Sequence, residues 1–108
     1  MAFAYRVFQT DEFAREFRKL GPQVQKLLDN AIREILFNRP YSSKVLKENL
    51  KGKRSLRVGN YRIIFAICEE CRKENYVQLN GCKDCKKHGT NDIIMFTCGP
   101  RSKVYEEY

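Results

Sequence analysis

The stretch SLRVGNYRIIFAI, residues 55–67, decides the fold of this chain. Polar and apolar residues alternate over residues 55–58, which is typical of a strand with one exposed face. The dipeptide GN that follows is a turn signal. Residues 61–67 are almost all apolar, which predicts a central strand covered on both faces, with Arg62 as its one charged residue. The stretch therefore predicts two strands that are joined by a tight turn and pair antiparallel.

The N-terminal part of the chain predicts one strand and two helices. Residues 3–9, FAYRVFQ, are rich in aromatic and β-branched residues, which favours a strand. Thr10 is a suitable N-cap, and apolar residues then recur at steps of three and four, as in an amphipathic helix. Gly21 and Pro22 end this helix and begin a longer one, which ends near Pro40. The short connection predicts a helical hairpin.

The C-terminal part predicts one more strand, over residues 92–98, DIIMFTC. Residues 41–53 mix polar, basic and apolar side chains, and we expect them to form an ordered loop. The order β-α-α-β-β-β predicts an α+β fold with a mainly antiparallel four-stranded sheet, and the two-helix hairpin covers one of its faces. The other face or an edge of the sheet is then free to display basic residues.

The positive charge of the chain is concentrated in one segment. The 108 residues include 21 Lys and Arg against 13 Asp and Glu, a net charge of +8. Residues 44–62 alone contribute +6, from seven basic residues and one acidic residue. This pattern predicts a polyanionic partner, most commonly nucleic acid, although a solvated basic face would look the same. A single histidine argues against a catalytic site built mainly on histidine.

The cysteines predict a metal site. Four of the five form two CxxC pairs: Cys68, Cys71, Cys82 and Cys85. This spacing suits four thiolates around one structural zinc ion, and His88 could replace one of them. No signal peptide or membrane-length apolar stretch is visible, so we expect a cytoplasmic protein, in which disulfides are the weaker interpretation.

Three stretches carry a resemblance to a known family: EFAREFRKLGP (12–22), LKENLKGKRSLRVGNYRIIF (46–65) and CGPRSKVYEEY (98–108). They resemble the RelE/ParE superfamily of toxins from type II toxin–antitoxin modules. The match covers nearly the whole chain except the cysteine segment. It implies one RelE-like domain over residues 1–108, of the microbial ribonuclease type, with a zinc-knuckle-like hairpin insertion at 68–91.

The resemblance also implies an activity. RelE-type toxins are ribosome-dependent endoribonucleases that cut messenger RNA in the ribosomal A site and so inhibit translation. They use the RNA's own 2′-hydroxyl as nucleophile, in a reaction that needs no metal. The implied partners are the ribosome, messenger RNA and a cognate RelB-like antitoxin, which holds the toxin in a hetero-oligomer.

The family's site residues match four positions of this sequence. Arg62 is the arginine of the central-strand YR, Arg57 is the basic residue of the preceding strand, and Arg101 and Tyr105 belong to the C-terminal GxRxxVY. Guanidinium groups suit the phosphate because their planar fork binds two oxygens at once. We expect Arg57 and Arg62 to hold the scissile phosphate and Arg101 to support it or the leaving oxygen. Tyr105 would stack on a base or assist proton transfer.

The general base is less well defined. Some family members carry a lysine pair upstream of the central strand, but Ser55 occupies one of these positions here. Lys51 and Lys53 lie slightly earlier and are the best available bases, provided that neighbouring cations lower their pKa. Further basic residues of the same segment are expected to contact RNA: Lys44, Lys47 and Arg54.

Two other functions remain open on the sequence. ParE-like inhibitors of DNA gyrase share the fold, but they generally lack the ribonuclease cluster. A non-catalytic, zinc-stabilised RNA-binding module would have a similar composition.

Overall fold

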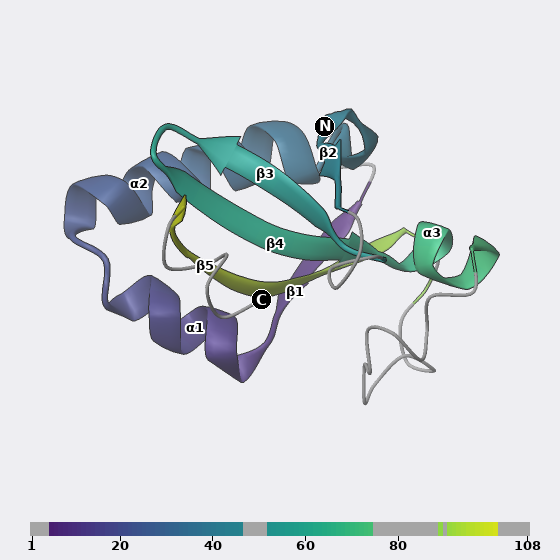
Figure 1. Ribbon diagram of the computed structural model, residues 1–108, viewed down its shortest axis with the longest axis horizontal. Helices are drawn as coiled ribbons and strands as arrows, with labels where there is room; N and C mark the ends of the chain where they lie inside the picture. The colour runs from purple at the N-terminus through teal and green to yellow at the C-terminus, as the bar shows by residue number, and fades with distance from the viewer. Residues whose placement is uncertain (1–4, 47–51, 75–88, 90, 102–108) are drawn as a thin grey trace.

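In the part of the chain that the computed structural model describes, residues 5–46, 52–74, 89 and 91–101, five strands form one sheet (Figure 1). The strands follow the order β1-β5-β4-β3-β2 across the sheet. Their bounds are β1 (Arg6–Gln9), β2 (Lys44–Val45), β3 (Arg54–Val58), β4 (Tyr61–Ile67) and β5 (Asp92–Pro100). The helical segments are α1 (Asp11–Arg18), α2 (Pro22–Ala31), the π-helix η1 (Ile32–Leu36), the 3-10 helix η2 (Pro40–Ser42) and α3 (Cys68–Lys73). The predicted α+β class is confirmed.

The predicted central hairpin is confirmed. Strands β3 and β4 pair antiparallel around the turn at Gly59, whose φ of 62° lies in the left-handed region that favours glycine. Strand β4 lies at the centre of the sheet and pairs antiparallel with β5 on its other side. Its residues Ile63 and Ile64 point to opposite faces and are both fully buried, as expected for a strand covered on both sides.

The sheet is mainly antiparallel, as predicted, but the expected count of four strands was wrong, because five strands form it in the described residues. Strand β1 pairs parallel with β5, because no hairpin joins these two strands and the sheet can therefore accept either direction. A fifth strand, β2, pairs antiparallel with β3 in the segment expected to be a loop. It has only two residues, and Val45 is 49% exposed, so no apolar alternation marked it in the sequence.

Both N-terminal helices begin as the sequence predicts. The Thr10 hydroxyl accepts a hydrogen bond from the Phe13 amide at 3.1 Å and so caps α1, while Pro22 opens α2. Buried side chains of these helices pack on the same face of the sheet, with Phe13 from α1 and Leu28 from α2 in one core cluster. None of the described helices is long and apolar enough to cross a membrane.

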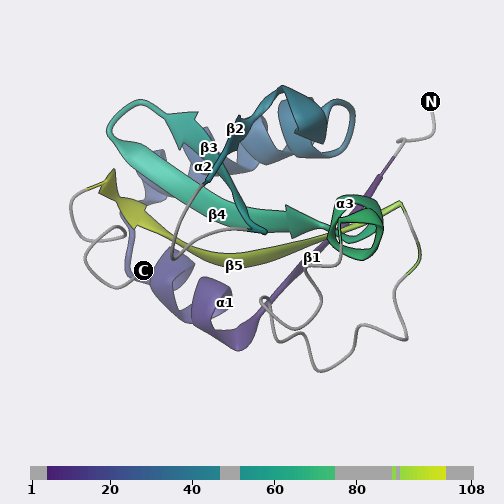
Figure 2. The same ribbon diagram turned by 45° about the vertical axis from the view of Figure 1, so that its right-hand side comes forward.

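The cysteine segment begins with a helix that the sequence did not predict. Helix α3 starts at Cys68, directly where β4 ends, and Figure 2 shows it at that end of the sheet, away from α1 and α2. Cys68 and Cys71 are both buried. The fifth cysteine, Cys98, lies in the core on β5. Burial, with a smaller contribution from Glu16, raises the pKa of its thiol to about 12, so Cys98 stays protonated at neutral pH.

Candidate functional site

Strand register places two of the predicted site arginines side by side. Leu56 and Val58 of β3 face the helices, so Arg57 between them faces the opposite side of the sheet. Arg57 is directly opposite Arg62 on β4, and Arg62 is directly opposite Gly99 on β5. The two guanidinium groups therefore extend from neighbouring strands on the face that α1 and α2 do not cover.

The third arginine reaches the same place from the end of β5. Arg101 lies two residues beyond Gly99, and its amide donates to the carbonyl of Asn60 in the β3–β4 turn at 3.0 Å. This bond ties the end of β5 to the turn. As a result, Arg57, Arg62 and Arg101 line one open hollow of about 310 Å³, together with Gly59, Asn60 and Pro100. We call these three residues the arginine cluster.

The cluster holds positive charge that no carboxylate in the described part of the chain neutralises. Arg62 is only 7% exposed, and its Nη1 donates to the Tyr61 carbonyl at 3.0 Å. Arg57 is exposed and makes a long contact of 3.4 Å from Nε to the Gly59 carbonyl. Among the described residues, no Asp or Glu forms an ion pair with any member of the cluster. Like charges directly opposite each other on a sheet are unfavourable, so this arrangement favours the binding of an anion.

Gly99 contributes to the site by having no side chain. It lies next to Arg62 in the row that runs across β3, β4 and β5, where any other residue would place a side chain on the same face. Its φ is 155°, which residues with a side chain rarely adopt. In the sequence, Gly99 belongs only to the C-terminal motif and Asn60 only to a turn signal. Their roles depend on the pairing of β5 with the hairpin.

The described lysines lie outside the cluster. The Lys53 ammonium lies 5.2 Å from the centre of the Phe96 ring. Lys53 precedes Arg57 by four residues, on the order of 13 Å along an extended strand, so it does not line the hollow. Lys44 is exposed on β2. Three of the residues predicted for catalysis or RNA binding lie outside the described part of the chain: Lys47, Lys51 and Tyr105.

Arg54 was expected to contact RNA, but its side chain is only 8% exposed. Its guanidinium forms a two-bonded ion pair with Glu70 of α3, at 3.0 and 2.7 Å. It also donates to two backbone carbonyls. Protein groups thus enclose Arg54, whereas the arginine cluster borders an open hollow.

Half of the predicted zinc ligands can be placed. Cys68 and Cys71 lie three residues apart on α3, which puts them on one side of the helix. Cys82, Cys85 and His88 lie outside the described residues. Within the described ranges, no group of three or more His, Cys, Asp or Glu side chains comes together to hold a metal. The zinc site therefore stays a prediction.

Comparison with known proteins identifies the fold. No family model matches the sequence, and no curated protein matches it. Solved structures do match over nearly the whole chain. The RelBE2 toxin–antitoxin complex of Mycobacterium tuberculosis gives a TM-score of 0.69 at 21% identity, covering 94% of this chain and 95% of that one.

Two further solved structures match this chain over nearly its whole length. The isolated RelE toxin of E. coli gives a TM-score of 0.60 at 20% identity, covering 96% of this chain and 94% of that one. The archaeal RelE–RelB complex of Pyrococcus horikoshii gives a TM-score of 0.58 at 19% identity, covering 93% of this chain and 98% of that one. Despite about one-fifth sequence identity, this chain has the fold of the RelE toxins.

Proposed function

We propose that this protein is the toxin of a toxin–antitoxin system and that it cuts messenger RNA on the ribosome. The observation that carries the proposal is the arginine cluster. Arg57, Arg62 and Arg101 come from three separate segments and line one hollow, and the described residues supply no carboxylate to neutralise them. The RelE toxin fold supports the same assignment.

In the proposed reaction the RNA supplies its own nucleophile. The 2′-oxygen forms a bond to phosphorus while the bond from phosphorus to the 5′-oxygen breaks. The 2′-hydroxyl proton passes to a base, and the departing 5′-oxygen takes up a proton from an acid. Negative charge accumulates on the phosphate in the transition state, and fixed guanidinium groups stabilise it there more strongly than in the ground state.

Each member of the cluster suits one part of this reaction. Arg62 is buried and fixed by the Tyr61 carbonyl, so it provides a preorganised contact for a phosphate oxygen. Arg57 is exposed on the neighbouring strand and would bind a second oxygen. Arg101, at the rim, would support the leaving oxygen. For proton transfer we propose Tyr105 and Lys51. The Lys53 ammonium packs on the Phe96 ring outside the hollow, so we assign it no role in the reaction.

We further propose a RelB-like antitoxin as the protein partner. Two of the matching structures are complexes of a RelE-type toxin with its antitoxin, from Mycobacterium tuberculosis and Pyrococcus horikoshii. The excess of positive charge in residues 44–62 favours an acidic segment in that partner. Co-expression with a short acidic open reading frame beside the gene should restore growth and yield a stable complex.

The cysteines are proposed to hold one structural zinc ion, with Cys82 and Cys85 completing the ligand set of Cys68 and Cys71. We expect one zinc per purified chain and a lower melting temperature after chelation. Cys68→Ser should lose the metal, while the control Cys98→Ala should keep it, because Cys98 lies in the core cluster with α1 and α2. Equal zinc contents in the two variants would contradict the assignment.

The nuclease proposal is tested by mapping transcript ends after brief induction of the gene. The wild type should produce new ends within codons of translated messages. Arg62→Ala should reduce them by about 100-fold, the usual effect of removing one group that stabilises the transition state. The control is Arg18→Ala, an exposed arginine on α1, which should cleave like the wild type. Growth arrest with intact transcripts and trapped gyrase would instead support a ParE-type inhibitor.

A further inference from the structure

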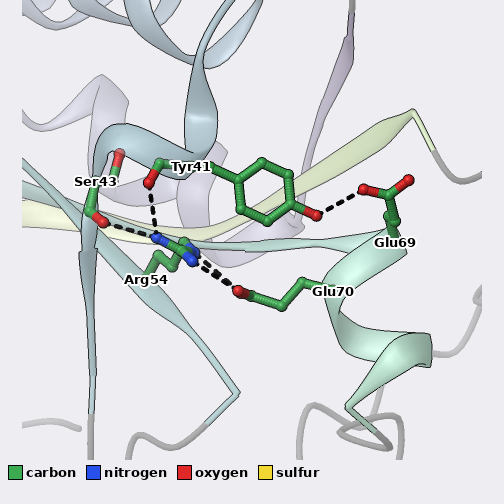
Figure 3. Close-up of polar contacts among 5 residues, drawn as sticks. All are labelled: Tyr41, Ser43, Arg54, Glu69 and Glu70. Carbon is green, nitrogen blue, oxygen red and sulfur yellow. Dashed lines mark hydrogen bonds and ion pairs between the residues drawn. The ribbon is translucent and has the colours of Figure 1, made fainter.

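Arg54 connects three segments that lie far apart in the sequence (Figure 3). From β3, its guanidinium binds both carboxylate oxygens of Glu70 on α3. Its Nη1 donates to the carbonyls of Tyr41 and Ser43, at 3.2 and 2.7 Å. The Tyr41 ring also lies 5.1 Å from the Arg54 guanidinium carbon. Arg54 therefore joins α3 to the segment that leads into β2.

A second contact between the same segments lies beside the first. The Tyr41 hydroxyl donates to Glu69 of α3 at 2.9 Å. Partial burial and this hydrogen bond raise the pKa of Tyr41, so the hydroxyl remains a donor well into the alkaline range. Glu69 and Glu70 are the two middle residues of the Cys68-x2-Cys71 pair. The two residues that separate the cysteines thus bind α3 to Tyr41 of η2 and to Arg54 of β3.

Helix α3 is attached at the paired residues of the β2–β3 hairpin, residues 44–46 and 53–55, which we call the hairpin base. Val45 pairs with Arg54 itself, and the Leu46 amide donates to the Lys53 carbonyl at 3.1 Å. The basic segment of the sequence, residues 44–62, starts with the first residue of this hairpin, Lys44, so we call it the basic hairpin. Any displacement of α3 would leave the Arg54 charge buried without its counter-ion, which is strongly unfavourable. The position of α3 and the order of the hairpin base are therefore energetically linked.

We propose that Arg54, Tyr41, Glu69 and Glu70 form a latch that docks α3 on the sheet, keeps the Cys68–Cys71 pair buried and holds the base of the basic hairpin in place. Coupling of this kind is reciprocal: opening the latch loosens the hairpin, and loosening the hairpin exposes the cysteines. The latch goes beyond the proposed ribonuclease function, because its test does not depend on RNA cleavage.

The test measures thiol accessibility and hydrogen exchange in the native, reduced protein with a chelator present, so that bound metal does not protect the thiols. A short iodoacetamide pulse is followed by peptide mass spectrometry, which reports each cysteine separately. Glu70→Gln removes the carboxylate that pairs with Arg54. Alkylation of Cys68 and Cys71 should become at least ten-fold faster, and amide exchange at residues 43–46 should rise with it.

Three controls make the result specific. Glu74→Gln removes the same charge from an exposed residue just after α3 and should behave like the wild type. Cys98, in the core, should react equally slowly in every variant. Tyr41→Phe keeps the Arg54–Glu70 pair and should give a smaller increase at the same two cysteines, which serves as the test if Glu70→Gln does not fold.

The proposal is overturned if Glu70→Gln and Tyr41→Phe react no faster than Glu74→Gln. It is also overturned if Cys98 becomes reactive in parallel, since that indicates general loss of the fold. Faster alkylation without faster exchange at residues 43–46 would likewise refute the coupling.

Discussion

The two buried arginines of the central hairpin, Arg54 and Arg62, are equally hidden from solvent, at 7% exposure each, but have different surroundings. Arg54 binds the carboxylate of Glu70 and two carbonyls. The described partners of Arg62 are backbone carbonyls, and the residue opposite it is another arginine. Burial alone therefore does not distinguish the two roles. A buried cation paired with a carboxylate is already neutralised within the fold, whereas one without a carboxylate partner among the described residues is suited to bind an anion.

The largest expected effect concerns Arg54. Arg54→Met leaves the Glu70 carboxylate without its partner, and breaking a buried ion pair in this way lowers the free energy of unfolding by about 3–5 kcal/mol. Urea denaturation followed by circular dichroism measures the loss. The double variant Arg54→Met with Glu70→Leu should recover most of it, because no buried charge remains. If Arg54→Met alone were as stable as the wild type, the Arg54–Glu70 ion pair would not contribute to the stability of the fold.

The next effect is the response of the arginine cluster to an added anion. An anion that binds only the folded protein stabilises it by about 1.4 kcal/mol when present at ten times its Kd. We expect sulfate to raise the melting temperature of the wild type, and sodium chloride at matched ionic strength to raise it less. Arg62→Met should lose the sulfate-specific part of the shift, while Arg18→Met should retain it. An unchanged shift in Arg62→Met would place anion binding elsewhere.

A smaller effect is expected for the stability of Arg62→Met without added anion. Removing this charge relieves its repulsion with Arg57 on the neighbouring strand, so the free energy of unfolding should rise by up to about 1 kcal/mol at low ionic strength. Urea denaturation checks the sign against Arg54→Met, which should change in the opposite direction. A clear loss of stability would mean that Arg62 is part of the structural framework, like Arg54.

The smallest effect concerns Tyr41 and depends on pH. The pKa of Tyr41 is raised in the folded state, so above the unfolded value near 10 the folded chain binds more protons than the unfolded chain. Stability contributed by the Tyr41 hydroxyl is therefore present below pH 10 and falls as the pH rises further. Tyr41→Phe should lose about 0.5 kcal/mol at pH 7, as expected for one partly exposed hydrogen bond. Thermal melts at pH 7 to 11 should show a weaker alkaline decline in Tyr41→Phe than in the wild type.

Much of the candidate site followed from short-range patterns in the sequence. A two-residue turn between the two strands is enough to place Arg57 opposite Arg62, because the turn sets the register of the pairing. The Thr10 cap and the Pro22 start of α2 were predictable for the same reason, since each acts within one turn of helix. The arrival of Arg101 beside these residues was expected from the family resemblance and not from any local pattern.

By itself, then, the amino-acid sequence determined the hairpin, the two N-terminal helices and the face on which Arg57 and Arg62 lie. Only the tertiary structure decided that β1 runs parallel to β5, that β2 adds a fifth strand within the described residues, and that Glu70 neutralises Arg54 across 16 residues. The physical reason is the distance along the sequence over which each interaction acts. Alternation, caps and turns act over a few neighbouring residues, but a charge receives its counter-ion from whichever segment folding brings beside it, and no local pattern records that choice.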